Sequence, residues 1–396
     1  MHAMSNDHAP VQADLLDLPP LVDTADALAE LVSDLREQPW LAVDTEFLRE
    51  RTYYAQLCLI QVATPTGRVA CVDPLGALDL SPLWAVLADP AITKVFHAAA
   101  QDVEVLLQAS GAVPEPLFDT QIAAALSGLG DQVGYARLVE ARLGVTLDKS
   151  ASRADWSQRP LEPELLRYAG DDVRYLAELY PALRDELAAR KRLAWLEEDF
   201  ARLADPETYA NPPAEAWRRV RGHHQLDGAG RGLLQALAAW REEAAAAADR
   251  PRGWLVRDEL LLEIARRRPR NAQRLNKLRG SNKLDAATRE TLLARVNATL
   301  DNPPAQWPTV AARPQLEAAG EAAVDALMAV ARLAADEAGV SIASLTARKE
   351  LERLVAGETD LPVLQGWRGE LVGRRLRAWL AGEIALVGRD GGATLA

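Results

Sequence analysis

Two proline-rich segments divide this chain, and they restrict it to separate folded units joined by linkers. The first segment lies at 206–213 and the second at 303–314. Because proline disfavours helix at its own position and at the one before, no long helix is expected to cross either segment. The length of 396 residues also exceeds that of one ordinary domain. We expect three units: a first unit at 20–205, a second unit at 212–298 and a third unit at 312–388.

The first unit begins with short apolar runs at hairpin-like spacing, at 40–43, 57–62 and 69–72. Strand and helix patterns then alternate up to about residue 126. From 163 to about 203, apolar residues recur every three or four positions, which indicates one or two amphipathic helices. An antiparallel meander followed by strand–helix alternation predicts an α/β fold, a mixed sheet flanked by helices.

The second and third units show helical periodicity only. It is clearest in the Ala-rich stretch at 232–248 and begins again from Leu316. Each unit has about the size of a small five-helix module. A degenerate internal repeat is therefore one interpretation of the all-α part of the chain.

Charge is distributed unevenly along the chain. The formal net charge is −12, yet residues 1–205 carry −16, residues 206–396 carry +4, and the block 251–300 carries +7. The average argues against a nucleic-acid partner, whereas the basic block could supply phosphate contacts. Acidic surface that serves solubility alone remains an equally simple explanation of the first unit.

Cysteine content and hydropathy indicate the compartment. The two cysteines, Cys58 and Cys71, fall in expected strands and are too few for a disulfide framework. The longest apolar stretch, 52–67, is too short and too polar to span a membrane. No basic start followed by an apolar core opens the chain. We expect buried thiols, a cytoplasmic protein and no membrane partner.

Acidic side chains at three places carry the chemistry. Asp44 and Glu46 follow an apolar run and, being two apart, share one side of an extended chain. Asp102 begins an expected helix, and Tyr168 and Asp172 share one helix face. Burial of like charges favours a divalent cation, and Mg²⁺ and Mn²⁺ prefer oxygen ligands. Taken singly, each place is better explained by an ordinary structural role: a solvated strand end, a helix cap or a core pair.

Together, these five side chains resemble the DEDDy branch of the DEDD 3′→5′ exonuclease superfamily. In the sister branch a histidine stands five residues before the last aspartate, where this chain has Arg167. The stretches DTEFLRERTYYAQLCLIQVA, FHAAAQDVEVL and YAGDDVRYL, with a K-x(3)-R-x-D-W-x(2)-R-P run at 149–160, are similar to the ribonuclease D family. The resemblance covers about 20–390 and implies a ribonuclease H-like exonuclease domain followed by two all-α HRDC-like domains, the second more divergent.

The resemblance also implies a site with two divalent cations, Mg²⁺ or Mn²⁺, and a catalytic role for all five side chains. Asp44 would bridge the cations, Glu46 and Asp172 would complete the first site, and Asp102 would support the second. Tyr168 would orient the attacking water. For His97, a hydrogen bond that ties strand to helix is favoured over catalysis. Asp171 is expected to face away from the site.

Basic residues at two places are candidates for binding nucleic acid. For Lys149, Arg153 and Arg159, phosphate contacts and ion pairs with acidic neighbours remain equally open. A second group lies in the first HRDC-like unit, where phosphate contact is weighed against a solvated helix face. It consists of Arg266, Arg267, Arg268, Arg270, Arg274 and Lys277.

The leading hypothesis is a 3′→5′ exoribonuclease that trims 3′ extensions of structured RNA and releases nucleoside 5′-monophosphates. The family resemblance implies RNA with a free 3′ end, in particular tRNA precursors, as the partner. Two alternatives stay open at this point, an exodeoxyribonuclease of the same superfamily and a non-catalytic RNA-binding scaffold. The sequence has no P-loop, which counts against a helicase-associated nuclease.

Overall fold

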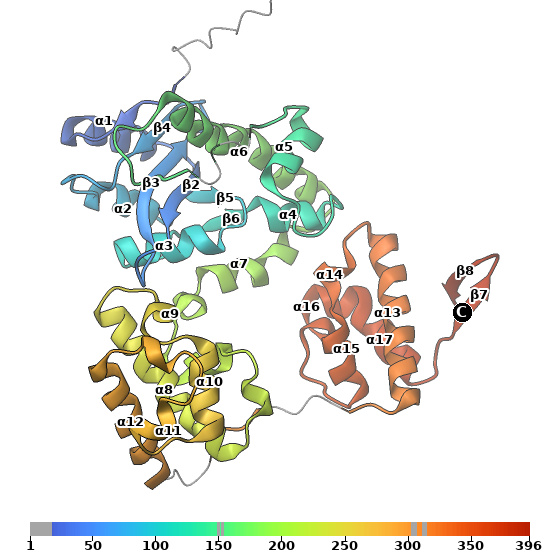
Figure 1. Ribbon diagram of the computed structural model, residues 1–396. Coiled ribbons are helices and arrows are strands. Elements are labelled where there is room, and N and C mark those ends of the chain that lie inside the picture. Colours follow the sequence, from blue (N-terminus) through green and yellow to red (C-terminus); the bar gives the residue numbers. More distant parts are fainter. Residues whose placement is uncertain (1–17, 149–150, 152–153, 302–306, 311–314) are drawn as a thin grey trace, which may run out of the picture.

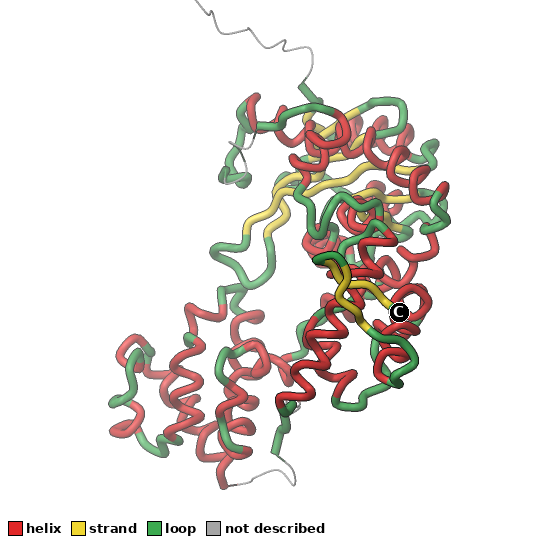
Figure 2. The backbone as a smooth tube through the Cα atoms, turned by 90° about the vertical axis from the view of Figure 1, so that its right-hand side faces the viewer, coloured by secondary structure: helices red, strands yellow, loops and turns green. Residues whose placement is uncertain are grey.

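The computed structural model describes residues 18–148, 151, 154–301, 307–310 and 315–396. Figure 1 shows the sheet-containing first unit at the top and two helical units below it, the second at the left and the third at the right. The view in Figure 2, turned by 90°, again shows the strands gathered in the upper part of the molecule, apart from a small hairpin near the C-terminus.

A six-stranded mixed sheet forms the centre of the first unit, as predicted. The meander β2–β3–β4 is antiparallel, whereas β1 pairs parallel with β4, β5 with β2, and β6 with β5. Its spatial order is β1-β4-β3-β2-β5-β6. The strands are β1 (Leu21–Val22), β2 (Trp40–Leu48), β3 (Gln56–Ala63), β4 (Val69–Val72), β5 (Thr93–Phe96) and β6 (Leu117–Asp119).

Helices cover both faces of this sheet because its central strands are apolar on both sides. On β2, Leu41 and Val43 pack in one cluster with residues of α1, α2 and α3, whereas Ala42 packs in another with residues of α4 and α6. The helices of this unit are α1 (Ala25–Leu35), α2 (Ser81–Leu87), α3 (Ala100–Ser110), α4 (Thr120–Leu126), α5 (Tyr135–Leu143), α6 (Pro163–Ala189) and α7 (Glu197–Ala204), with short turns η2 (Leu193–Leu196) and η3 (Pro206–Tyr209).

The second unit is a helical body with a hydrophobic cluster of its own. Trp217 is fully buried in this cluster, together with leucines of α8 and α10. Its elements are η4 (Pro213–Arg219), η5 (His223–Gln225), α8 (Gly228–Ala247), α9 (Arg252–Leu255), α10 (Asp258–Arg267), α11 (Ala272–Leu275), η6 (Ser281–Lys283) and α12 (Ala286–Asp301).

The third unit has a similar succession of elements, from a long helix through a single-turn helix to a helix of intermediate length. In the intermediate helices, Leu351 and Leu354 of the third unit are buried three residues apart, as are Leu261 and Ile264 of the second. Its elements are α13 (Ala318–Ala338), α14 (Ile342–Leu345), α15 (Arg348–Val355), η7 (Pro362–Leu364), α16 (Gly366–Arg368), the π-helical turn η8 (Gly369–Gly373) and α17 (Arg374–Leu380).

The prediction of helices alone was wrong for the end of the third unit. There β7 (Leu386–Arg389) and β8 (Gly392–Leu395) form an antiparallel hairpin. Asp390 and Gly391 join the strands with φ of 51° and 81°. Two consecutive positive φ angles are what a two-residue hairpin turn requires, and Asp-Gly is the sequence signal for it.

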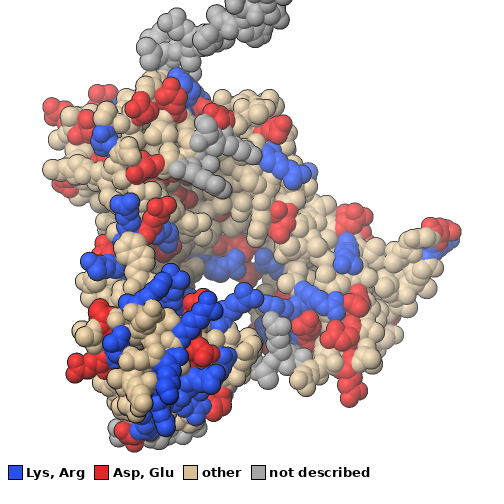
Figure 3. Space-filling model, in the orientation of Figure 1, with Lys and Arg blue, Asp and Glu red and all other residues tan. Residues whose placement is uncertain are grey.

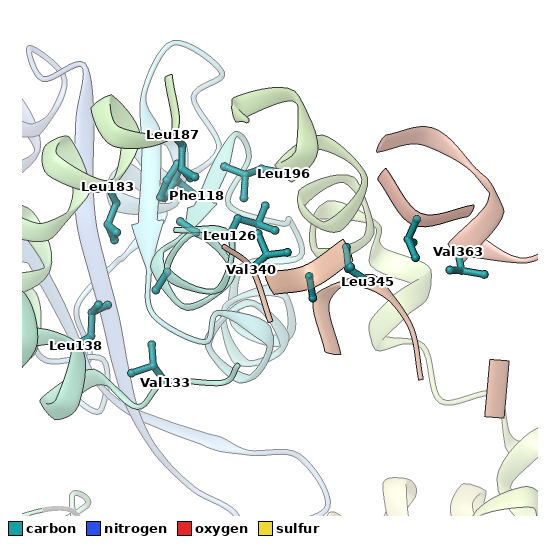
Figure 4. Packing of buried hydrophobic residues seen from close by; sticks show 14 of the residues in the cluster. Phe118, Leu126, Val133, Leu138, Leu183, Leu187, Leu196, Val340, Leu345 and Val363 are labelled. Carbon is teal, nitrogen blue, oxygen red and sulfur yellow. The ribbon is translucent and has the colours of Figure 1, made fainter. Parts of the chain in front are cut away.

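The third unit packs on the first and shares its hydrophobic core. One cluster contains Leu126 and Leu196 from the first unit and Val340 and Leu345 from the third (Figure 4). Around it, the Trp195 and Trp367 rings stack at 4.6 Å with 5° between their planes.

Polar contacts reinforce the junction between the first and third units. Arg368 forms ion pairs with Glu198 at 2.8 Å and Asp199 at 3.1 Å. Arg192 donates hydrogen bonds to Leu126 O and to Ala338 O. The first and third units therefore form one packed body, whereas the apolar core of the second unit is separate.

Candidate active site

The structure brings three of the predicted carboxylates together. Ligand oxygens of Asp44, Glu46 and Asp172 all lie within 4.8 Å of one another. Asp44 and Glu46 come from β2 and Asp172 from α6, whose residues pack against the sheet face opposite α1 and α2. A strand and a helix far apart in the sequence thus supply one cluster of hard oxygen donors.

The strand that carries Asp44 and Glu46 is longer than predicted. It continues through both residues to Leu48 because β3 pairs with it along this whole length. Its pairing with β5, in contrast, stops at Ala42. The acidic half of β2 therefore has one edge without a neighbouring strand, and a register shift between Glu46 and Phe47 alters the local direction of the strand.

Asp102, the fourth carboxylate, lies close to this cluster without joining the group of three. It is in the first turn of α3, is 7% exposed, and accepts a 2.5 Å hydrogen bond from Thr45 Oγ1. Thr45 lies between Asp44 and Glu46 and was not predicted to matter. Its hydrogen bond to Asp102 depends on the packing of α3 beside β2, which the local sequence does not indicate.

Burial raises the pKa of all four carboxyls, and repulsion from neighbouring carboxylates adds to this shift. For Asp44 the pKa rises well above its usual range, first through burial and then through Asp102, Asp172 and Glu46. Burial, followed by Asp172 and Asp102, raises the pKa of Glu46 to about 9. Burial is also the main cause that raises the pKa of Asp102 and of Asp172 to about 7.

Burial and repulsion thus disfavour the ionised form of these carboxylates. A bound divalent cation would offset the repulsion and would keep the carboxylates ionised. Oxygen donors from three converging carboxylates match the ligand preference of Mg²⁺ and Mn²⁺. The residues present therefore fit a divalent metal site, in agreement with the prediction.

Tyr168 lies one helical turn before Asp172 on α6. Its pKa is raised above the usual value of a phenol, first by burial and then by Asp172, Glu46 and Asp44. Its ring lies 6.1 Å from that of Trp156. A phenol held in its neutral form beside carboxylates can donate a hydrogen bond, and it is a poor general base.

Tyr135 is a second tyrosine near the site that was not predicted from the sequence. It opens α5, and its hydroxyl donates a 2.9 Å hydrogen bond to Asp171 O on α6. Burial and then the charges of Asp172 and Asp44 raise its pKa. Nothing in the local sequence distinguishes it from an ordinary core aromatic residue.

The structural interpretation of His97 is confirmed. Its Nδ1 forms a 3.0 Å hydrogen bond with Oγ1 of Thr120, the first residue of α4, and Thr120 in turn donates to Phe96 O. His97 thus ties the end of β5 to α4. Burial is the main cause that lowers its pKa.

Asp171 forms an ion pair with Arg174 at 2.9 Å, outside the group of three carboxylates. The two cysteines are buried and free, as predicted. Burial raises the pKa of Cys58 to about 11 and that of Cys71 to about 12, which keeps both thiols protonated and unreactive.

For Arg159, the structure supports the ion-pair interpretation. Its Nε and Nη2 donate to Asp73 at 2.5 and 2.8 Å, and three further N–H groups donate to carbonyl oxygens of Cys58, Trp156 and Gln158. All five guanidinium donors are used, so none remains for a phosphate. Lys149 and Arg153 lie outside the described residues.

The basic group of the second unit is partly paired with acids at its surface. Glu263 pairs with Arg266 and with Arg267, Arg268 pairs with Asp227, and Arg270 pairs with Asp301. Figure 3 shows many Lys and Arg side chains gathered on this unit, in contrast to the mixed charges of the first.

Two family models match the chain, and together with the fold they define its class. A 3′–5′ exonuclease model matches residues 19–188, which include all five predicted site residues, and an HRDC domain model matches residues 231–290. The fold and the carboxylate site thus define a 3′→5′ exonuclease that carries an HRDC domain.

Comparison with individual proteins is more specific. Ribonuclease D of Acidiphilium cryptum is 41% identical over 381 residues, covering 94% of this chain and 95% of its relative. Ribonuclease D of Granulibacter bethesdensis is 41% identical over 382 residues, with the same coverage. The chain belongs to the ribonuclease D family and is a 3′→5′ exoribonuclease.

Solved structures agree with this assignment. The crystal structure of Escherichia coli RNase D, an exoribonuclease involved in structured RNA processing, has a TM-score of 0.80 and 36% sequence identity. It covers 91% of this chain and 98% of its own. The catalytic core of RRP6 from Trypanosoma brucei follows with a TM-score of 0.56 at 26% identity, covering 74% and 82%. Within the described residues, no helix is both long and apolar enough to cross a membrane.

Proposed function

We propose that this exoribonuclease trims 3′ extensions of structured RNA, with tRNA precursors as the substrate class, and releases nucleoside 5′-monophosphates in the cytoplasm. The observation that carries the proposal is the convergence of Asp44, Glu46 and Asp172 within 4.8 Å. Similarity to E. coli RNase D, an exoribonuclease involved in structured RNA processing, supports the substrate class.

The carboxylates would hold two divalent cations, Mg²⁺ or Mn²⁺. Asp44 would bridge the two positions, Glu46 and Asp172 would complete the first, and Asp102 would support the second. When bound, such cations activate a water and stabilise charge on the phosphate and the departing 3′ oxygen. Thr45 would keep the Asp102 carboxylate in position through its hydrogen bond.

Tyr168 would act by positioning. Because its pKa lies above the usual phenol value, it keeps its proton at neutral pH and can hold the attacking water or a phosphate oxygen by donating a hydrogen bond. Its place one turn before Asp172 keeps the phenol on the same helix face as that carboxylate.

The second unit would add affinity for RNA through phosphate contacts. Arg274 and Lys277 are its strongest candidates, because no ion pair within 4.0 Å engages them in the described part of the chain. Arg266, Arg267, Arg268 and Arg270 would contribute by exchanging their surface acid partners for phosphates, since exposed ion pairs are weak. We extend the HRDC-like assignment to the third unit, which the matching succession of elements supports.

A matched pair of variants on α6 tests this proposal. Asp172→Asn removes a carboxylate of the group of three, whereas Asp171→Asn removes the adjacent one, which pairs with Arg174. We expect Asp172→Asn to lose Mg²⁺-dependent release of mononucleotides from a 3′-extended tRNA precursor while it still binds that RNA. Asp171→Asn should retain activity within a few-fold of the unaltered protein.

Three results would contradict the proposal. Retained activity in Asp172→Asn would remove this cluster from the reaction. Equal or faster turnover on a DNA strand of the same sequence would favour the exodeoxyribonuclease alternative, and failure of the unaltered protein to shorten any RNA with Mg²⁺ or Mn²⁺ would favour a binding scaffold.

A further inference from the structure

A cleft of about 700 Å³ lies between the first and second units. The first unit contributes the loop between β2 and β3, with Tyr53 and Tyr54, and the second contributes Arg219 and Arg252. Figures 1 and 2 both show this loop extending from the sheet toward the helices of the second unit. None of the roles assigned above uses this cleft.

Specific hydrogen bonds fix the two walls of the cleft against each other. The backbone N–H groups of Tyr53 and Tyr54 donate to Asp249 Oδ1 at 3.0 and 3.3 Å. The Tyr53 hydroxyl donates at 2.9 Å to Glu242, which is 2% exposed and also pairs with Arg219 and Arg252 at 3.4 and 3.5 Å. These hydrogen bonds and ion pairs indicate a specific interface between the first and second units.

Two elements of the first unit carry residues of both the active site and the cleft. Strand β2 carries Glu46 and leads directly to Arg49 in the cleft wall, at most ~11 Å away for three extended residues. Helix α3 carries Asp102 near the site and Gln108 in the cleft, a rise of about 9 Å. An RNA strand whose 3′ end reaches the carboxylates could therefore pass along this cleft.

Exposed aromatic rings lie at the same junction. Among the described residues, Tyr54 at 49% and Trp254 at 64% are the exposed large aromatic side chains. Tyr54 lines the cleft, and Trp254 follows the lining residue Gly253 on α9. Exposed rings beside cationic side chains are the combination that binds single-stranded nucleic acid, because bases stack on rings while cations contact phosphates.

Charge in the cleft is compatible with a polyanion. Arg49, Arg219 and Arg252 line it against Glu104 and Glu242, which leaves one net positive charge. The three arginine side chains are 42%, 35% and 48% exposed, so each is partly open to solvent despite its ion pair. Figure 3 shows Lys and Arg side chains around this junction.

We infer that this cleft binds the unpaired nucleotides that precede the 3′ end of an RNA substrate, with bases stacked on Tyr54 and Trp254 and phosphates beside the three arginines. The inference rests on the proposed function for its ligand class. The cleft between the first and second units would then help to set the length of unpaired 3′ tail that the enzyme prefers.

Tyr54→Ala and Trp254→Ala, alone and combined, test this inference on two RNAs. One RNA is a hairpin with a long unpaired 3′ tail, and the other is a trinucleotide too short to reach from the site through the cleft. We expect each substitution to raise KM roughly five- to hundredfold on the tailed RNA, the range for loss of one stacked base. The kcat on both RNAs and the KM on the trinucleotide should not change.

Three controls make the result specific. Tyr54→Phe keeps the ring and should behave like the unaltered protein, and Leu380→Ala removes an exposed apolar side chain from the third unit, far along the chain. Unchanged thermal unfolding midpoints would show that the variants fold.

Two kinetic outcomes would overturn the inference: an unchanged KM on the tailed RNA, or an equal rise in KM on both RNAs. Affinity for the tailed RNA, measured by fluorescence anisotropy in a chelator, should fall by the same factor as KM rises. An unchanged affinity would likewise overturn the inference. If the unaltered protein releases no mononucleotides, the proposed function fails, and this affinity measurement still decides whether the cleft binds RNA.

Discussion

Replacing Gly128 with alanine should loosen the packing of the third unit on the first. Gly128 follows α4 with a φ of +86°, and a Cβ built there would lie 2.7 Å from the carbonyl oxygen of Gly339, just after α13. That oxygen belongs to the backbone, so it cannot rotate away as the tip of a flexible side chain could. Arg192 holds the same two segments together by bonding both Leu126 O and Ala338 O.

A second glycine in the same loop separates conformational strain from this clash. Gly130 has a φ of +98°, and a Cβ there would meet nothing within 4 Å. Left-handed backbone costs a non-glycine residue about 1–2 kcal/mol, so both substitutions should lower the free energy of unfolding by that amount. Gly128→Ala carries an additional overpacking cost of about 1–3 kcal/mol, because the two units must move apart.

Thermal unfolding followed by scanning calorimetry measures the difference. At roughly 2–4 °C per kcal/mol, Gly128→Ala should melt roughly 2–12 °C below Gly130→Ala. Because both units share one hydrophobic cluster, they should still unfold in one transition. If the two variants melt within about 1 °C of each other, the junction between the first and third units is not tightly packed, and the reasoning fails.

Two further predictions concern the site and its surroundings. In the presence of a chelator, the raised carboxyl pKa values favour the folded state at low pH, and this stabilisation is lost as the pH rises from about 4 through 7 to 9. The gain in Tm on adding Mg²⁺ should therefore grow between pH 5.5 and 8.5. A gain that stays constant would contradict the assigned metal site. Arg159→Met should lower the free energy of unfolding by about 3 kcal/mol, because it leaves the Asp73 carboxylate without its cationic partner. The salt dependence of RNA binding should stay unchanged. A weaker salt dependence at unchanged stability would instead support a phosphate-binding role for Arg159.

Local patterns were sufficient to predict the sheet, whereas the carboxylate positions were identified through the resemblance to a known family. Leu41, Ala42 and Val43 alternate between two packed helical layers, so the pattern of apolar residues follows the physical period of a strand. The carboxylates could be identified because their chemistry requires particular residue types on particular elements. In the structure, Asp44 and Glu46 on β2 and Asp172 on α6 form a single cluster.

Contacts between distant segments could not be predicted from the sequence. No spacing indicates that Thr45 bonds Asp102, since this pairing depends on where α3 docks against β2. For Arg159, the charge was visible and the partner was not, because Asp73 is brought beside it only by the packing around the sheet. The hairpin at the end of the chain differs, because it joins neighbouring segments and its Asp-Gly turn is a local signal that could have predicted it.

The shared core of the first and third units has a consequence for the order of synthesis. A ribosome adds about 5–20 residues per second, so Val340 and Leu345 emerge roughly 7–30 s after Leu196, which they join in one cluster. During this interval the nascent exonuclease domain exposes the apolar surface that the third unit later covers. Such exposed surface is a target for chaperones and a source of aggregation. A transcript cut short after the second unit would therefore yield a protein that carries every predicted site residue and still lacks the third unit, which covers part of its core.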